Sequence, residues 1–181
     1  MNELYFAEYL REFRAKGKIS LESALIVRHG DGEDGDGEIF STVHGGEPPP
    51  QNGSEPSGQW RPSLTDREQD SKHLGLVFPL VKRPGNAFDY ISVGRTSNVD
   101  VTLPLQQISK FHAYFSKTPT GEYTIADGGS KNGTRVGTRK LEVRTPVPVR
   151  SGERIALGPY LFTFYTPDKF AELVIAKAIR S

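Results

Sequence analysis

The stretch that decides the fold reads His112-Ala-Tyr-Phe-Ser-Lys-Thr-Pro-Thr-Gly-Glu-Tyr-Thr-Ile-Ala126. Side chains alternate with a period of two at both of its ends, which is typical of β-strands that bury one face. Pro119-Thr-Gly121 between these ends is a turn sequence, because proline presets its own φ angle and glycine tolerates angles that other residues avoid. The stretch therefore predicts two strands, at 112–116 and 123–126, joined by a turn.

The same pattern continues on either side of this stretch. Short β-rich segments alternate with turn sequences such as Asn132-Gly133 and Gly158-Pro159, and no segment from 73 to 166 has the pattern of a crossover helix. This spacing is typical of a β-sandwich or a barrel and argues against a parallel α/β sheet. The further strands that it predicts are 76–82, 89–94, 99–101, 134–136, 145–149, 154–157 and 160–165.

Helices are predicted near both ends of the chain. Apolar residues recur at helical spacing at the start of the sequence, which predicts an amphipathic helix at 2–16 that ends at Gly17. The segment 19–28 fits either a short helix or a strand, and we take 1–28 together as an N-terminal helical segment. Pro167 is a favourable first-turn residue, and the pattern after it predicts a closing helix at 167–181.

Residues 29–73 differ in composition from the segments on both sides. An acidic glycine run that includes Asp31 and Glu38 begins at His29, and the remainder is rich in Gly, Pro, Ser, Gln and charged residues. Such a composition buries too little apolar surface to offset the entropy of ordering, so we expect a mostly disordered linker. Its acidic residues lack the spacing of a calcium-binding EF-hand loop, so no metal site is predicted.

Composition narrows the classes of function. The 181 residues carry a formal net charge of +1, which gives no overall basic field for binding nucleic acid. There are no cysteines, which excludes disulfides and a cysteine nucleophile and fits a cytoplasmic protein. No apolar run approaches the roughly 18 residues of a membrane span. We therefore expect neither a nucleic acid nor a membrane as partner.

Four motifs fall in loops between the predicted strands, where a rigid sheet places binding groups. A phosphate ester carries about −1.5 to −2 charges and three acceptor oxygens, so a site that reads it needs a guanidinium, a hydroxyl and amide donors in one place. Arg95, Ser109 and the loop around Asn132 offer that set. The motifs are Gly94-Arg95, Ser109-Lys-Phe-His112, Asp127-Gly-Gly-Ser-Lys-Asn-Gly-Thr134 and Ser151-Gly-Glu-Arg-Ile-Ala-Leu-Gly158.

In order and spacing these motifs resemble the forkhead-associated (FHA) domain, whose signature combines glycine-arginine, serine-x-x-histidine and asparagine-glycine with a closing glycine-acid-x-isoleucine strand. The resemblance covers 74–166 and implies an all-β, FHA-type sandwich of about 10–11 strands that binds phosphothreonine peptides. It implies no catalytic activity and no cofactor. It also implies that Arg95 pairs with the phosphate, Ser109 donates a hydrogen bond to it, and Asn132 holds the peptide main chain.

The remaining site candidates flank or support these three residues. Lys110 and Lys131 occupy positions that commonly add contacts, although many FHA domains carry asparagine, serine or threonine there. Lysine at these positions strengthens charge attraction and gives up some directional hydrogen bonding. Ser130, also a candidate for contact with the phosphopeptide, either assists the loop or caps it. The residues predicted to support the site are Gly94, His112 and Gly133, with His112 bracing the loop by hydrogen bonds.

Three functions of different classes follow from these patterns. The first is an adaptor or regulatory module that binds phosphothreonine in a partner protein, with a Ser/Thr kinase or its substrate as a candidate partner. Phosphorylation of Thr65 or Thr42 would also allow the chain to occupy its own site. The second is a hydrolase built on Ser109, His112 and Asp127, although the sequence has no Gly-x-Ser-x-Gly pattern. The third is a phosphate-independent scaffold that acts through its helical flanks.

Overall fold

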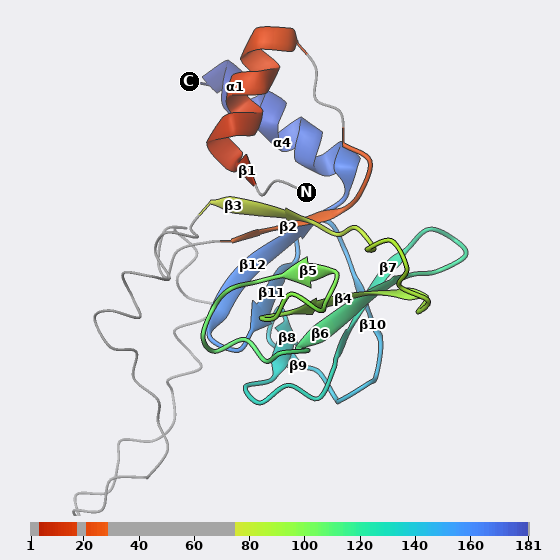
Figure 1. Cartoon of the computed structure of the whole chain (residues 1–181). Coiled ribbons are helices and arrows are strands. Elements are labelled where there is room, and N and C mark those ends of the chain that lie inside the picture. The colour runs from red at the N-terminus through yellow and green to blue at the C-terminus, as the bar shows by residue number, and fades with distance from the viewer. Residues whose placement is uncertain (1–3, 18–20, 29–74, 181) are drawn as a thin grey trace, which may run out of the picture.

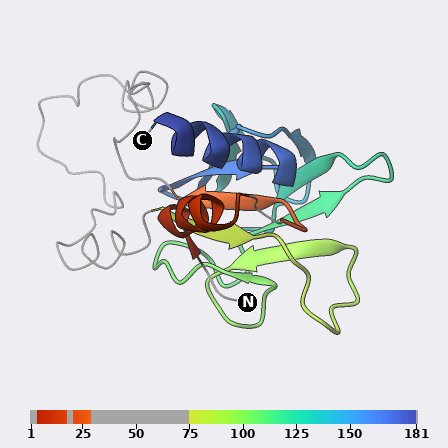
Figure 2. The same cartoon turned by 90° about the horizontal axis from the view of Figure 1, so that it is seen from above.

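The chain forms a β-sandwich with two helices packed on the outside of one sheet (Figures 1 and 2). The computed structural model describes residues 4–17, 21–28 and 75–180. The predicted linker at 29–73, with Thr42 and Thr65 in it, lies outside the described residues. The predicted all-β sandwich, with a helix at each end of the chain, is confirmed.

Seven strands form the larger sheet, and its neighbouring strands are all antiparallel. In sheet order these strands are β1 (Leu4–Tyr5), β3 (Leu76–Pro79), β2 (Leu25–Arg28), β12 (Tyr160–Tyr165), β11 (Arg154–Leu157), β8 (Thr134–Val136) and β9 (Arg139–Lys140). The smaller sheet has one parallel pair, between its last two strands. Its order is β10 (Val147–Val149), β7 (Tyr123–Asp127), β6 (Ala113–Lys117), β4 (Tyr90–Gly94) and β5 (Val101–Thr102).

The main core lies between the two sheets and is built by the alternation that the sequence predicted. On β6 and β7, Phe115 pairs with Ile125 and both side chains are fully buried. Phe162 and Phe164 of β12 belong to the same buried cluster from the opposite sheet. Because side chains alternate between the faces of a strand, their chain neighbours point outward and leave one face of the smaller sheet to solvent.

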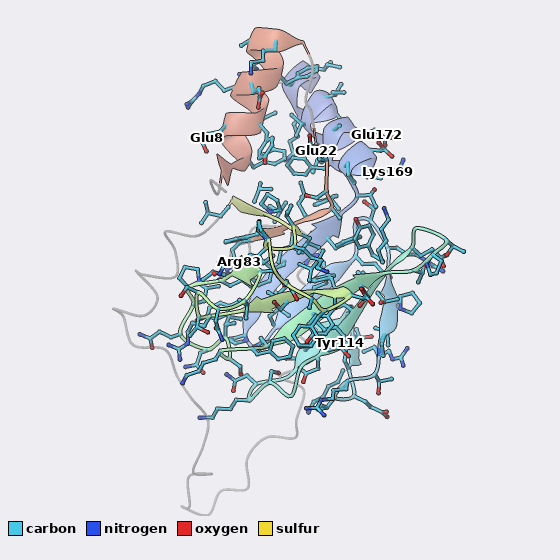
Figure 3. All side chains as sticks on the ribbon, turned by 45° about the vertical axis from the view of Figure 1, so that its right-hand side comes forward. Glu8, Glu22, Arg83, Tyr114, Lys169 and Glu172 are labelled. Carbon is cyan, nitrogen blue, oxygen red and sulfur yellow. The ribbon has the colours of Figure 1, made fainter. Side chains whose placement is uncertain are left out.

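A second apolar cluster joins the helices to the outer face of the larger sheet. Helix α1 (Phe6–Lys16) and helix α4 (Pro167–Arg180) pack against each other over Leu25 and Val77. The ring of Phe170 makes an edge contact with the ring of Tyr9, at a centroid distance of 5.2 Å. Figure 3 shows Glu8 on α1 and Lys169 and Glu172 on α4, at the end of the molecule that carries the helices.

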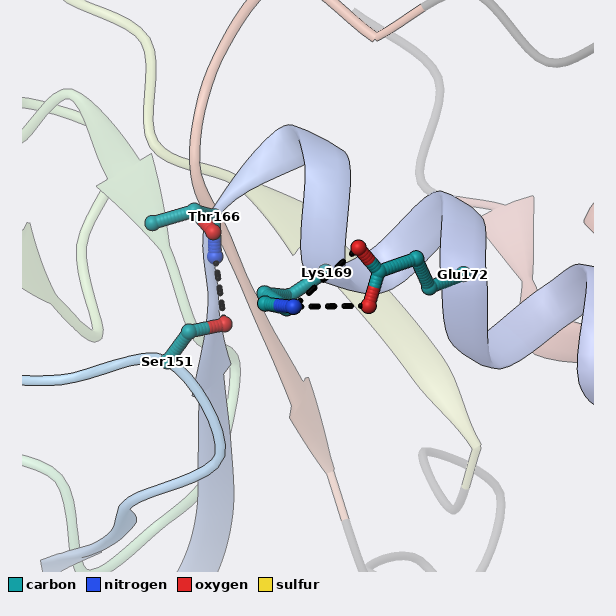
Figure 4. Close-up of polar contacts among 4 residues, drawn as sticks. All are labelled: Ser151, Thr166, Lys169 and Glu172. Carbon is teal, nitrogen blue, oxygen red and sulfur yellow. Dashed lines mark hydrogen bonds and ion pairs between the residues drawn. The ribbon is translucent and has the colours of Figure 1, made fainter.

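The start of α4 is attached to the sandwich by a hydrogen bond. The backbone N–H of Thr166 donates to the hydroxyl oxygen of Ser151, in the turn before β11, at 3.1 Å (Figure 4). On the exposed side of the helix, Lys169 and Glu172 form an ion pair of 2.8 Å. The predicted start of this helix at Pro167 is confirmed, and neither described helix is long and apolar enough to cross a membrane.

The N-terminal segment departs from its prediction in two places. The helix begins at Phe6 rather than at residue 2, because Leu4–Tyr5 pair with β3 as strand β1. Leu25–Arg28 form β2, between β3 and β12, so the helical segment predicted for 1–28 is wrong for these residues. The sandwich therefore includes strands outside the predicted range 74–166. Gly17 ends α1 as predicted, with a φ of 68° that favours glycine.

The described ranges contain twelve strands, compared with the predicted 10–11. Besides β1, the sequence patterns missed β9, because Arg139–Lys140 is only two residues long and both side chains are exposed. For β2 the patterns fit either a helix or a strand. Strands β8, β11 and β12 have the predicted bounds. Strand β3 ends at Pro79, three residues before its predicted end. The N–H of Leu80 still donates to the carbonyl oxygen of Ala24, but the N–H of Val81 turns back to the carbonyl oxygen of Pro79 at 3.1 Å.

Candidate functional site

Gly94 and Arg95 bring the end of β4 against the loop that contains Ser109. A side chain has no room at Gly94, because a Cβ there would lie 2.1 Å from the carbonyl oxygen of Lys110. This close approach allows the Arg95 N–H to donate to the Ser109 carbonyl oxygen at 2.9 Å. The Arg95 side chain is exposed, and its Nε–H donates to the carbonyl oxygen of Ile108 at 3.2 Å. The guanidinium is thereby fixed at the edge of the Ser109 loop.

Ser109 connects this loop to the loop between β7 and β8. Its hydroxyl oxygen accepts a hydrogen bond from the backbone N–H of Lys131 at 3.0 Å. A hydroxyl has one hydrogen and two acceptor lone pairs, so this contact leaves the hydrogen of Ser109 available for a ligand. The hydroxyl is only half-buried and lies in the loop to which Arg95 is bound. The geometry thus places a free hydroxyl donor next to a fixed guanidinium.

His112 lies completely buried beneath these two loops and joins them. Its Nδ1 accepts a hydrogen bond from the backbone N–H of Ser109 at 3.1 Å, and its Nε2 lies 3.1 Å from the carbonyl oxygen of Gly133. An amide N–H only donates and a carbonyl only accepts, so the ring is neutral with its proton on Nε2. Burial lowers the pKa of His112, against opposing effects of the Gly133 hydrogen bond and the charge of Asp127.

The lowered pKa of His112 predicts a loss of stability in mild acid. In the unfolded chain a histidine titrates near pH 6.5, whereas the folded protein resists protonation of His112 to a lower pH. The unfolded state therefore binds the proton first, and stability falls as the pH drops below about 6.5. Urea unfolding at a series of pH values from about 7.5 to 5 is expected to show this decline.

The carboxylates of the protein contribute in a separate, lower pH range. The pKa values of Asp127 and Asp100 are also lowered, so their stabilising effect is lost only as the pH falls below about 4. His112→Gln, which has no titrating ring, is the control and should give a flat profile above about pH 5. A wild-type profile that is equally flat over that range would contradict the assigned role of His112.

Asp127 organises the loop between β7 and β8 from a buried position. One carboxylate oxygen accepts the backbone N–H groups of Gly129 and Ser130, at 2.8 and 2.9 Å. The other accepts the hydroxyls of Ser130 and Thr134, each at 2.6 Å. Burial alone would raise the pKa of Asp127, but these hydrogen bonds together lower it. The side chain therefore holds the loop as a carboxylate anion.

These contacts separate Ser130 from the other site candidates. Its hydroxyl hydrogen is donated to Asp127, and the hydroxyl cannot donate the same hydrogen to a ligand. In this conformation Ser130 supports the loop. The sequence motifs indicated Asp127 only as a catalytic candidate, and its role as an anchor of the loop was not predicted. Asp127-Gly-Gly-Ser130 carries a signal for that role, because an aspartate often accepts the N–H groups two and three residues ahead.

Asn132 lies exposed at the tip of the same loop. Its side-chain Nδ2 donates to the backbone carbonyl oxygen of Gln107 at 2.9 Å and to the Gln107 Oε1 at 3.0 Å. The following residue, Gly133, has a φ of 77°, and its carbonyl oxygen accepts the N–H of Gly158 at 2.9 Å as well as the contact with His112. Asn132 is therefore held beside the Ser109 loop by Gln107, and the next residue, Gly133, is held by Gly158 and His112.

Positive charge gathers around the Ser109 hydroxyl. Arg95, Lys110 and Lys131 are exposed and lie in the loops that Ser109 joins. Thr96 adds a contact between two of these loops, because its hydroxyl, which also contacts Asn98, lies 3.2 Å from the carbonyl oxygen of Lys110. Within the described ranges, none of the three cations forms an ion pair with an acid. The edge is suited to an anionic ligand.

The geometry of a serine hydrolase is not formed by these residues. The ring of His112 accepts a hydrogen bond from the backbone N–H of Ser109 and makes none with its hydroxyl. Asp127 is occupied by Ser130, Thr134 and Gly129, and its carboxylate does not orient the imidazole through a hydrogen bond. A nucleophilic serine needs a base within hydrogen-bond reach of its hydroxyl. In the described residues no group of three or more potential metal ligands occurs either.

The fold and this edge define a class of protein, a β-sandwich whose loops at one end combine exposed cations with fixed hydrogen-bond donors. Residues 91–158 match the FHA domain family.

Similar proteins come from plants and bacteria. The chain is 33% identical over 107 residues to an FHA domain-containing protein of Arabidopsis thaliana, a match that covers 55% of this chain and 28% of that protein. The FHA domain of a Chlamydia trachomatis protein is 29% identical with a TM-score of 0.43, covering 51% of this chain and 86% of that one. Mycobacterium tuberculosis EmbR, solved in complex with a low-affinity phosphopeptide, is 26% identical with a TM-score of 0.41, covering 51% and 22%.

Proposed function

We propose that this chain binds phosphothreonine-containing peptides at the edge formed by Arg95, Ser109 and Asn132. The observation that carries the proposal is the orientation of the Ser109 hydroxyl. Its oxygen accepts the N–H of Lys131, so its hydrogen can be donated outward, beside the guanidinium of Arg95. A phosphate dianion accepts both groups, and charge-assisted hydrogen bonds of this kind are about twice as strong as neutral ones.

Further residues of the edge have distinct roles in the proposal. Lys110 and Lys131 add positive charge near the phosphate. Asn132 contacts the main chain of the peptide, as the resemblance to FHA domains implies, and the Gln107 side chain gives up its hydrogen bond to Asn132 on binding. Asp127, His112 and Gly94 hold the loops in place before the ligand arrives, which reduces the entropy lost on binding.

Peptide titration tests the proposal. Three peptides of one sequence, carrying phosphothreonine, phosphoserine or unmodified threonine, are titrated into the full chain and followed by calorimetry. The phosphothreonine peptide is expected to bind most tightly, with about tenfold weaker binding of phosphoserine, because the missing methyl leaves a small apolar gap empty. The unmodified peptide should show no measurable binding. Equal affinity for all three peptides would contradict the proposal.

A phosphate-independent scaffold is the second candidate function. One observation favours it, because Ile175 and Ile179 lie one turn apart on α4 and are 37% and 78% exposed. Apolar side chains at this spacing provide an interaction surface on a helix. If Arg95→Ala leaves the recovery of partners from a lysate unchanged while Ile175→Glu/Ile179→Glu abolishes it, the scaffold function replaces phosphopeptide binding.

Regulation by the chain itself is part of the proposal. A phosphate on Thr65 or Thr42 would be tethered to the domain, and a short tether gives a high effective concentration at the site. Mass spectrometry after treatment with Ser/Thr kinases that finds no phosphate on either threonine would end this part of the proposal. Action downstream of Ser/Thr kinases and a cytoplasmic location remain predictions from the sequence.

A further inference from the structure

The hairpin of β8 and β9 extends the cationic edge beyond Asn132. Gly133 directly precedes β8, and a Cβ at Gly133 would lie 3.5 Å from the Cε of Lys140 on β9. The ammonium group of Lys140 is one bond beyond this carbon, so the charge lies close to the loop that holds Asn132. The positively charged surface therefore continues from Lys131 through this loop onto the hairpin.

Arg135 and Lys140 face each other across the two strands. They are direct partners in the antiparallel register, and the neighbouring pair is Val136 and Arg139. Like charges directly opposite each other destabilise a strand pair, whereas opposite charges stabilise it. No acid among the described residues forms an ion pair with either side chain. This includes the exposed Glu142, which follows Lys140 by two positions. The paired positive charges of Arg135 and Lys140 therefore do not stabilise the hairpin.

Protection of a sheet edge does not explain the whole arrangement. Strand β9 is the edge strand of the larger sheet, and lysine or arginine on an edge strand prevents pairing with other chains. That role accounts for Arg139 and Lys140. It does not account for Arg135, because β8 lies inside the sheet between β11 and β9. A second cation opposite Lys140 needs a different explanation.

We propose that Arg135 and Lys140 form a second anion subsite, which binds a carboxylate or a second phosphate of the same phosphopeptide. This inference rests on the proposed function, since the phosphothreonine at Arg95 and Ser109 places the peptide. An extended peptide advances about 3.3 Å per residue, so the second anion lies a few residues from the phosphothreonine. The preferred ligand is therefore a phosphothreonine peptide with a nearby acidic residue or a second phosphorylated residue. Binding of such a ligand depends more strongly on salt than binding of a neutral-flanked peptide.

A peptide scan with matched variants tests the subsite in the full chain. The reference peptide carries one phosphothreonine flanked by alanines. In a first series of peptides, each peptide carries a single glutamate at one of about four positions on either side of the phosphothreonine. In a second series, a second phosphothreonine takes the place of the glutamate. At one or more positions the added anion is expected to raise affinity about fivefold, as for two exposed ion pairs. Arg135→Gln/Lys140→Gln should remove this gain and leave affinity for the reference peptide unchanged.

The control variant, Arg11→Gln/Arg14→Gln, changes net charge equally on α1, at the end of the molecule opposite β8 and β9 (Figure 1). It should retain the gain. The hairpin variant should also unfold at the same or a higher urea concentration, because it removes a repulsion. If a second phosphothreonine raises affinity more than a glutamate at the same position, the preferred ligands are multiply phosphorylated peptides. If the two raise affinity equally, the preferred ligands are phosphopeptides with an acidic residue nearby.

Two results would overturn the inference, and they are distinguishable. If the reference peptide binds through Arg95 but no added anion raises its affinity, or if the hairpin variant keeps the gain, the subsite is absent while the proposed function stands. If no phosphothreonine peptide binds to the wild-type chain at all, the proposed function fails and the subsite fails with it.

Discussion

Replacing Arg95 with alanine is expected to weaken the binding of a phosphothreonine peptide by about 100-fold. The guanidinium lies at the edge of the loop that contains Ser109, because its Nε–H donates to the carbonyl oxygen of Ile108. Truncation removes the charge and leaves the phosphate facing only one hydroxyl and the two lysines. Calorimetric titration of one phosphothreonine peptide into wild-type and variant chains measures the change.

Two further variants separate the charge of Arg95 from its shape. Arg95→Lys keeps the charge and loses the planar fork that contacts two phosphate oxygens, so a loss of about tenfold is expected. Arg150→Ala is the matched control, because this exposed arginine follows β10, next to Ser151, which is bonded to the start of α4. It should bind like the wild type. Equal losses for Arg95→Ala and Arg150→Ala would mean that only net charge matters and that the proposed site is wrong.

The alternation is clearest in strands that have one face in the core and the other in solvent. Strand β6 is an example, since the buried Ala113 and Phe115 alternate with the less buried Tyr114 and Ser116, and its predicted bounds are shifted by one residue. Strand β2 differs because both of its faces are covered. Ile26 enters the core between the sheets, whereas Leu25 and Val27 enter the cluster beneath the helices. A strand buried on both faces has no alternation, so periodicity alone could not distinguish it from a helix.

Within the site, the sequence motifs pointed to the candidates for ligand contact and to three supporting residues, but not to the supporting role of Asp127. Arg95, Ser109 and Asn132 stand in motifs at the ends of strands, and the structure brings their loops into contact. The contribution of Asp127 depends on a buried carboxylate that receives three hydrogen bonds from its own loop and one from Thr134 at the start of β8. Local sequence suggests such a turn, but the loss of solvent that makes it important arises only when the loop packs on the sandwich.

Gly94→Ala is expected to reduce the free energy of unfolding by about 3 kcal/mol, as for a severe overpacking substitution. Gly94 has no unusual φ angle, so glycine is required there only for lack of space. The added methyl group would meet the carbonyl oxygen and carbon of Lys110, which are backbone atoms and cannot rotate away. Urea unfolding of the purified variant, monitored by far-ultraviolet circular dichroism, measures the loss of unfolding free energy.

Gly121→Ala provides the contrast that makes this result specific. Gly121 has a φ of 89°, and the atom nearest to an added Cβ is the Cε of Lys117, at 3.8 Å. This variant meets no obstacle and bears only the conformational strain of alanine in a left-handed region, about 1 kcal/mol. Unfolding free energies that are equally reduced in both variants would contradict the steric role of Gly94.

The same substitution at Gly94 should also weaken phosphopeptide binding in the fraction that stays folded. The close approach at Gly94 is what allows the Arg95 N–H to reach the carbonyl oxygen of Ser109. A shift of the Lys110 backbone would move the Ser109 hydroxyl away from the guanidinium, and a misplacement of this kind weakens two charge-assisted hydrogen bonds together. Gly121→Ala should keep wild-type affinity. A folded Gly94→Ala protein with wild-type affinity would show that the guanidinium and the hydroxyl act without a fixed separation.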